Sequence, residues 1–244
     1  MEHGGRAGIV LTAIHTVAET GSTNADVAEL ARSGAGEGLW LRAERQIAGR
    51  GRQGRAWASG NGNLYASTLV RLRPSDPPAP TLALVAAVAL EEAVGLFRPG
   101  GAAIKWPNDL LVDGAKLSGI LLERAGDAIV IGFGVNLAHH PEDLGRSTTS
   151  LAAHGPAPDP GVFLDALAEI FARWMERWRG EGLGPVRERW LARAHPLGTA
   201  LTARLADGGS VDGLFDGLDS AGALILRLAD GSRHVMHAGD VFLI

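Results

Sequence analysis

Alternating and periodic apolar positions predict the order of strands and helices along the chain. Residues 9–17 alternate between apolar and polar side chains and are rich in β-branched residues, which is typical of a strand. Residues 25–33 repeat apolar side chains at helical spacing, with Ser22 or Thr23 available as the N-cap. The same patterns predict strands at 38–44, 64–71, 102–106, 110–112, 116–124 and 128–134, and helices at 81–97, 162–178 and 185–194.

The central strands are separated by turns short enough for hairpins. Asp113-Gly114 and Gly126-Asp127 are turn sequences typical of antiparallel pairs. We therefore expect an α+β fold with a mixed, largely antiparallel sheet and helices packed on one face. The aromatic residues of 162–178 follow one side of the helix, so we interpret them, with Tyr65 and Trp106, as core side chains.

The pattern changes after residue 196. Four or five short strands follow, separated by Asp/Gly turns such as Asp216-Gly217 and Asp230-Gly231. We expect two domains, residues 1–196 and residues 197–244, of which the second is a small all-β barrel.

Composition and charge exclude several classes of protein. The 244 residues are 46% hydrophobic and 20% charged, with a formal net charge of −4, which argues against a surface devoted to nucleic acid. The absence of cysteine excludes disulfides, thiolate zinc sites and a cysteine nucleophile. No signal-peptide core is present, and the apolar run 82–90 is too short to cross a bilayer, so we expect a cytoplasmic protein without a membrane partner.

The eight histidines are scattered along the chain, with His139-His140 and His234/His237 as the close pairs. We expect them on the surface and predict no metal site formed by the protein alone.

Residues 49–57 (GRGRQGRAW) combine arginines and glycines with a tryptophan. Glycine lets the backbone approach an anion, and arginine offers a fork of donors that matches phosphate or carboxylate oxygens. Trp57 adds a flat surface on which a purine can lie. Taken alone, the segment is equally consistent with a solvated basic linker, with a contact to nucleic acid, and with a loop around a small, multiply charged anion.

Lysine is rare in this chain. Only two of the 23 basic residues are lysines, and both Lys105 and Lys116 fall in one short segment. The placement is modest evidence that this segment requires a compact ammonium group, which the planar guanidinium cannot replace. Lys105 is equally consistent with a solvated strand end and with a ligand contact.

Several motifs together resemble the biotin–protein ligase family. The resemblance covers about residues 9–244, and the motifs occur in the family's order and near its spacing. They are Ser22-Thr23-Asn24, Gln46 ahead of the Gly49–Arg55 loop, Trp57, the run Lys105–Asp109, Lys116-Leu117-Ser118-Gly119 and Gly132-Phe133-Gly134-Val135-Asn136.

The resemblance implies a catalytic domain like that of class II aminoacyl-tRNA synthetases and an SH3-like C-terminal barrel. It also implies a two-step reaction, in which biotin and ATP form biotinyl-5′-AMP and a lysine of a biotin carboxyl carrier domain then takes the biotin. Mg²⁺ is expected with the triphosphate. The implied catalytic residues are Lys116, Arg50 and Asp109; the implied biotin-binding residues are Ser22, Thr23, Asn24, Gln46, Arg50, Gly51, Arg52 and Lys116; and the implied ATP-binding residues are Arg52, Arg55, Trp57, Asn108, Lys116 and Asn136.

Within that set Asp109 has two candidate roles, orienting Lys116 or accepting a proton from the incoming lysine. Some family members carry an N-terminal winged helix that binds DNA; here about twenty residues precede Ser22, so we expect no DNA binding. A homodimer through an exposed sheet edge is a further expectation.

Two functions are alternatives to a biotin ligase: a ligase or transferase for lipoate or octanoate, and a non-enzymatic biotin or nucleotide sensor. The complete Arg/Gly loop and the C-terminal barrel favour biotin, and the presence of both Lys116 and Asp109 favours an enzyme.

Overall fold

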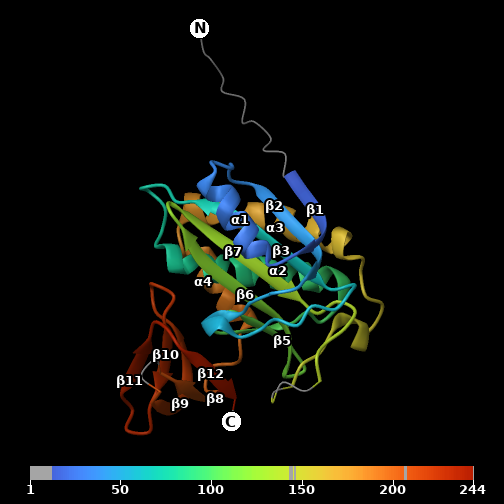
Figure 1. Cartoon of the computed structure of the whole chain (residues 1–244). Coiled ribbons are helices and arrows are strands. Elements are labelled where there is room, and N and C mark those ends of the chain that lie inside the picture. Colours follow the sequence, from blue (N-terminus) through green and yellow to red (C-terminus); the bar gives the residue numbers. More distant parts are fainter. Residues whose placement is uncertain (1–12, 143–144, 146, 206–207, 244) are drawn as a thin grey trace.

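The computed structural model describes residues 13–142, 145, 147–205 and 208–243 (Figure 1). Part of the predicted strand at residues 9–17 lies outside the described residues. The chain up to α4 contains the strands β1 (Ala13–Thr20), β2 (Leu39–Gln46), β3 (Leu64–Arg71), β4 (Ala103–Lys105), β5 (Asp109–Val112), β6 (Ala115–Ala125) and β7 (Ala128–Val135). Its helices are α1 (Thr23–Arg32), α2 (Leu82–Phe97), α3 (Pro160–Glu181) and α4 (Gly184–Arg193), with short 3-10 turns η1 (Arg52–Gly54), η2 (Ala79–Thr81) and η3 (Leu151–Ala153).

The seven strands form one sheet in the order β1-β2-β3-β7-β6-β5-β4. β1 pairs with β2 in parallel, and every other pair in this sheet is antiparallel. The hairpins β5–β6 and β6–β7 close at the two predicted turns. The predicted mixed, largely antiparallel sheet is confirmed.

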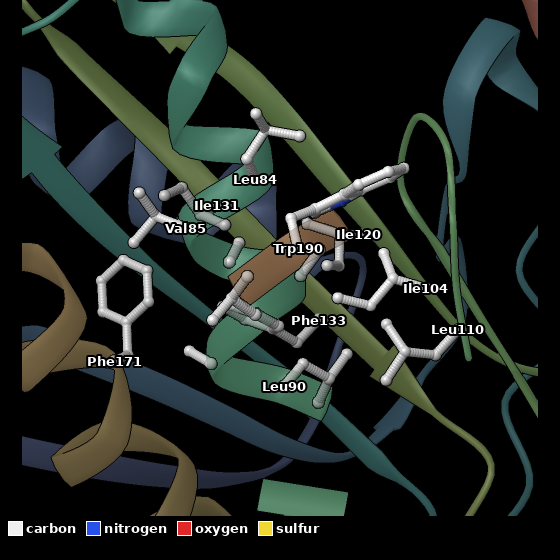
Figure 2. Close-up of a cluster of buried hydrophobic side chains, with 14 of the residues drawn as sticks. Leu84, Val85, Leu90, Ile104, Leu110, Ile120, Ile131, Phe133, Phe171 and Trp190 are labelled. Atoms are coloured by element: carbon white, nitrogen blue, oxygen red, sulfur yellow. The ribbon is translucent and has the colours of Figure 1, made fainter. Parts of the chain in front are cut away.

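The main core lies between this sheet and α2, α3 and α4 (Figure 2). Ile131 and Phe133 of β7 point toward α2, where they meet Val85 and Leu90, and Phe171 of α3 closes the cluster. The segment Ala79–Phe97 is apolar and long enough to cross a membrane by length and composition, with a mean hydropathy of 1.7. Because 67% of that segment is buried within the protein, its apolar surface is already used for packing.

The expectation that all helices pack on one face of the sheet is wrong. α1 covers the opposite face, where its Val27 and Ala31 pack against Leu41, Leu69 and Val130. The reason is visible in β3 and β7, whose residues are buried almost without alternation. A strand that is apolar on both sides requires cover on both faces of the sheet.

The C-terminal segment forms a second, five-stranded antiparallel sheet in the order β11-β10-β9-β8-β12, seen beside the end of α4 (Figure 1). Its strands are β8 (Ala200–Arg204), β9 (Ser210–Leu218), β10 (Leu224–Arg227), β11 (Arg233–Met236) and β12 (Asp240–Leu243). Trp190 of α4 contacts Phe215 of β9, with ring centroids 6.3 Å apart. Burial of these aromatic surfaces holds the second sheet against α4.

Candidate active site

The α1 side of the main sheet contains a cavity of about 80 Å³ at the ends of several strands. All of the predicted site residues except Asn136 line it. They come from the start of α1, the end of β2, the loop after β2, the β4–β5 turn and β6. The lining also includes Gly119, Gly132, Gly134 and Asp240, which sequence reasoning did not assign to the site.

The Arg/Gly loop folds into a compact turn over this cavity. Gly51 N–H donates to the Arg55 carbonyl at 2.7 Å, and Trp57 N–H donates to the Gly49 carbonyl at 2.9 Å. Gln53 and Gly54 adopt the left-handed conformation, with φ of 57° and 71°, which reverses the chain. The turn holds Arg50, Arg52 and Arg55 around one opening.

The second sheet reaches this loop through Asp240 at the start of β12. Arg52 Nη1 lies 3.2 Å from Asp240 Oδ1 and donates to the Gly239 carbonyl at 3.1 Å. Arg55 Nη2 lies 2.7 Å from Asp240 Oδ2. Burial works to raise the pKa of Asp240, but the hydrogen bond from Arg55 and the positive charges of both arginines outweigh it, so this pKa lies below its ordinary value.

Replacing Asp240 with asparagine is expected to loosen the loop. The carboxylate is charged at neutral pH, and because its folded-state pKa is lowered, its contribution to stability is lost only as the pH falls through that lowered value. Hydrogen–deuterium exchange at residues 49–57 should become about 3- to 10-fold faster at neutral pH. Asp216→Asn is the matched control, because Asp216 pairs with Arg233 within the second sheet. Unchanged exchange in Asp240→Asn would mean that this contact does not hold the loop.

Lys116 and Asp109 form an ion pair on the wall of the cavity. Their side chains are only 11% and 13% exposed, and a bulge between Leu110 and Leu111 shifts the register of β5 against β6. The Lys116 Nζ atom also lies 5.7 Å from the centre of the Trp57 ring. The compact Lys116 ammonium group is thus largely shielded from water. Its electric field is therefore screened less than that of a charge at the surface.

The Trp57 indole packs closely against the glycines of β6 and β7. A Cβ atom on Gly134 would lie 2.5 Å from Trp57 Cε2, and one on Gly119 would lie 3.0 Å from its Cζ3. Only glycine allows the indole to approach the sheet this closely. The aromatic surface therefore forms one side of the cavity.

A polar group lies where α1 begins. Thr23 N–H donates to Gln46 Oε1 at 2.8 Å, and the Ser67 hydroxyl lies 2.8 Å from Thr23 Oγ1 and 2.7 Å from Asn24 Oδ1. Asn24 Nδ2 donates to Glu123 Oε2 at 2.7 Å. Ser22 occupies the N-cap position, but its side chain makes no capping hydrogen bond, so neither predicted cap acts as one. This leaves Ser22 and Thr23 side chains on the cavity wall.

Asn136 does not belong to the cavity. It is buried, and its Nδ2 donates to the Thr149 carbonyl at 3.0 Å, where it holds the segment that follows β7. Lys105 also lies outside the cavity lining, in a neighbouring hollow, with Nζ 5.4 Å from the Phe242 ring. The predicted contact of Asn136 with a ligand is therefore not supported by its position.

Three of the described histidines, His140, His195 and His234, are partly buried rather than exposed as predicted. His195 follows α4; burial, and then the charge of Lys105, lower its pKa. No group of three or more His, Cys, Asp or Glu side chains in the described ranges is arranged to hold a metal ion.

The fold and the site together define a class of protein in which a cation-rich cleft can receive anionic substrates. Residues 18–136 match the biotin/lipoate A/B protein ligase family, and residues 197–244 match the biotin protein ligase C-terminal domain. The chain is 45% identical, over 93% of its length and 98% of the relative, to a biotin–[acetyl-CoA-carboxylase] ligase of Paracoccus denitrificans. The chain belongs to the biotin protein ligase family.

Further relatives agree with this assignment. A biotin–[acetyl-CoA-carboxylase] ligase of Mycobacterium tuberculosis is 36% identical over 93% of this chain and 88% of its own. Among solved structures, the biotin protein ligase of Aquifex aeolicus in complex with biotin and ATP shares the fold with a TM-score of 0.86 at 24% identity, covering 96% of this chain and 99% of that one. The biotin protein ligase of Leishmania major in complex with biotinyl-5-AMP has a TM-score of 0.64 at 27% identity, covering 93% and 99%.

Proposed function

We infer that the protein activates biotin with ATP to biotinyl-5′-AMP and transfers the biotin to a lysine of a biotin carboxyl carrier domain. The observation that carries this conclusion is the single cavity that joins the Arg/Gly loop, the Lys116–Asp109 pair and the polar group around Thr23. The family membership and the biotin, ATP and biotinyl-5-AMP named for the related structures support it.

In the first step a carboxylate oxygen of biotin attacks the α-phosphorus of ATP. The new P–O bond forms as the bond to the β-phosphate oxygen breaks, and pyrophosphate leaves. Two anions must approach each other, so catalysis depends on positioning and on cancelling their charge. We propose that Lys116 Nζ lies between the carboxylate and the α-phosphate, and that Arg50 and Arg52 hold the phosphates from the loop.

In the second step the amine of the acceptor lysine attacks the carbonyl carbon of the adenylate. An amide bond forms, the bond between that carbon and the AMP oxygen breaks, and the amine loses a proton. Asp109 is the nearest carboxylate to Lys116, and its ion pair supports the role of orienting that ammonium group. Acceptance of the lysine proton by Asp109 is the alternative role.

We propose that Trp57 covers the adenine and that Arg55 and Asn108 complete the nucleotide subsite. Mg²⁺ is expected to arrive as part of the ATP substrate, bound to its phosphate oxygens. Gly51 offers backbone close to the anion, and Ser22, Thr23, Asn24 and Gln46 surround the polar ureido head of biotin.

The loop must move for both substrates to bind. The cavity of about 80 Å³ is smaller than the roughly 150 Å³ that holds a single benzene molecule. We propose that the Asp240 contacts break and re-form as the loop opens for the substrates and closes over the adenylate, which water would otherwise hydrolyse.

Replacing Gly134 with alanine is expected to weaken ATP binding. The new Cβ would lie 2.5 Å from Trp57 Cε2, so the indole must leave its place against the sheet. Loss of one aromatic stack predicts an increase of about 10-fold in the KM for ATP, measured by pyrophosphate release. Gly95→Ala is the control, because a Cβ there meets no atom within 4 Å. An unchanged KM for ATP in Gly134→Ala would remove Trp57 from the nucleotide subsite.

The function is tested by incubating the protein with biotin, MgATP and a carrier domain and weighing the carrier by mass spectrometry. We expect a mass gain of one biotin on a lysine of the carrier, with AMP and pyrophosphate as products. A gain with lipoate or octanoate but not with biotin would select the alternative ligase. No gain with any of these acids would indicate a sensor rather than an enzyme.

We further propose the domain division 1–196 and 197–244, with an SH3-like C-terminal barrel and a catalytic domain like that of class II aminoacyl-tRNA synthetases. The C-terminal antiparallel sheet supports the SH3-like barrel, and the mixed sheet supports the synthetase-like catalytic domain.

A cytoplasmic location follows from the expected carrier substrate. β1 forms one edge of the main sheet, which supports a homodimer through strand addition, and the net charge of −4 supports the absence of DNA binding.

A further inference from the structure

A hollow of about 260 Å³ adjoins the cavity where β12 of the second sheet faces the main sheet. It is lined by β12, by the β4–β5 turn and by the start of β6, and we refer to it as the β12 hollow. A cavity of roughly 150 Å³ admits a benzene molecule, so the β12 hollow has room for one extended side chain.

The β12 hollow and the cavity share part of their walls. Both are lined by Arg55, Asn108, Asp109, Lys116 and Asp240. The Lys116–Asp109 pair, beside which we propose that the reacting carboxyl group of biotin lies, therefore faces both spaces. A group that enters the β12 hollow reaches this pair without passing the start of α1.

A second hollow lies on the other side of the β4–β5 turn, between the start of α2 and the β9–β10 turn. Its volume is about 340 Å³, and we refer to it as the α2 hollow. It meets the cavity at Arg52, Asn108 and Ile120, and neither Lys116 nor Asp109 lines it. Of the two hollows, the β12 hollow is thus the one that leads to the proposed position of the reacting carbon.

The β12 hollow has an exposed aromatic ring at its edge. Side chains alternate along β12, so Phe242 lies on the same face as Asp240, while Val241 points into the core. Phe242 is 40% exposed. Its ring centre lies 5.4 Å from Lys105 Nζ and 5.2 Å from Arg204 Cζ. An exposed ring between two cations suits a protein partner that presents apolar and acidic side chains together.

We propose that the β12 hollow receives the acceptor lysine of the carrier domain and that Phe242, Lys105 and Arg204 form the docking surface for the turn that bears it. This inference rests on the proposed function and adds the route of its second substrate. The carrier turn is expected to place apolar and acidic side chains next to the lysine. The lysine amine then attacks the adenylate as in the second step above: the amide bond forms, AMP leaves, and no further reactant is required.

The test measures biotin transfer separately from adenylate formation. The protein is loaded with biotin and MgATP. The bound biotinyl-5′-AMP is then mixed either with the biotin carboxyl carrier domain of an acetyl-CoA carboxylase or with hydroxylamine, a small nucleophile that needs no docking surface. Phe242→Ala should lower the second-order rate of transfer to the carrier about 10-fold and leave both adenylate formation and the reaction with hydroxylamine unchanged.

A second variant tests the opposite wall of the hollow. Lys105→Glu places a negative charge where we expect an acidic partner, so transfer to the carrier should slow by about 3- to 10-fold. Hydroxylamine should again react at the wild-type rate. Because this variant leaves the second sheet unchanged in sequence, it tests the docking surface independently of the folding of β12.

Two variants provide matched controls. Val235→Ala truncates an apolar side chain of β11 that is 44% exposed, at the opposite edge of the same sheet. Ala221→Trp narrows the α2 hollow, which we expect the carrier not to enter. Both should transfer biotin to the carrier at the wild-type rate.

The outcomes distinguish this inference from the proposed function. Wild-type transfer to the carrier in both Phe242→Ala and Lys105→Glu, or equal losses with carrier and hydroxylamine in both, would overturn the docking role while the wild-type protein still biotinylates the carrier. A loss confined to Ala221→Trp would place the carrier at the α2 hollow and also overturn it. A wild-type protein that forms no biotinyl-5′-AMP would overturn the function itself.

Discussion

Lys116→Gln is expected to lower the rate of biotinyl-5′-AMP formation by about 100- to 1,000-fold. The Lys116 ammonium group is largely shielded from water beside Asp109, so water would poorly replace the charge that we propose it places between the two substrates. Rapid-quench measurement of adenylate formation under single-turnover conditions reports this step directly. A rate within about 3-fold of wild type would remove Lys116 from the catalytic role.

The stability of this variant requires a control of its own. Removing Lys116 leaves the Asp109 carboxylate, which is 13% exposed, without its partner, and we expect a lower unfolding temperature. The double variant Lys116→Gln with Asp109→Asn removes both charges and should recover the unfolding temperature without recovering the rate. Recovery of the rate together with the stability would show that the loss was structural.

Arg52→Ala is expected to reduce kcat/KM for ATP by about 100-fold. The Arg52 guanidinium is 26% exposed and lies within hydrogen-bonding distance of Asn108 Oδ1 (3.4 Å) and of the Gly239 carbonyl (3.1 Å), so it joins the loop to the β4–β5 turn and to the segment before β12. Truncation removes this connection together with the proposed phosphate contact. Steady-state kinetics with ATP as the varied substrate measures the effect.

Two neighbouring variants separate these roles of Arg52. Arg52→Lys keeps the charge but loses the planar fork, so it should fall between wild type and Arg52→Ala. Arg55→Ala is the comparison within the same loop, because Arg55 is 49% exposed and its charge is screened by water. We expect only a severalfold loss there; equal losses at Arg52 and Arg55 would contradict the specific role of Arg52.

Local sequence patterns predicted the helices and strands well where neighbouring residues encode both the buried positions and the turns that bound them. The strand 64–71 matches β3 because it is mostly apolar, with Ser67 and Thr68 at its centre, and is bounded by polar and turn residues. In the structure all of β3 but its last residue is buried, which requires cover on both faces of the sheet. α1 supplies that cover, and its position places Thr23 and Asn24 on the cavity wall.

Contacts between distant segments explain what the sequence could not predict. Asp240 lies 188 residues from Arg52, and no local pattern links them. Ser67 and Glu123 are ordinary strand residues whose hydrogen bonds to Asn24 form only where β3, β6 and α1 meet. Asn136, predicted to bind ATP, lies at the end of a motif-bearing strand, but its amide donates to the Thr149 carbonyl and it is not among the residues that line the cavity.

The most direct measurement is a crystal structure of the protein with biotin and a non-hydrolysable ATP analogue. The account predicts that Lys116 Nζ lies within about 3.5 Å of both the biotin carboxylate and an α-phosphate oxygen, with Arg50 and Arg52 directed at the phosphates. A bound complex in which all three side chains point into bulk solvent would contradict it.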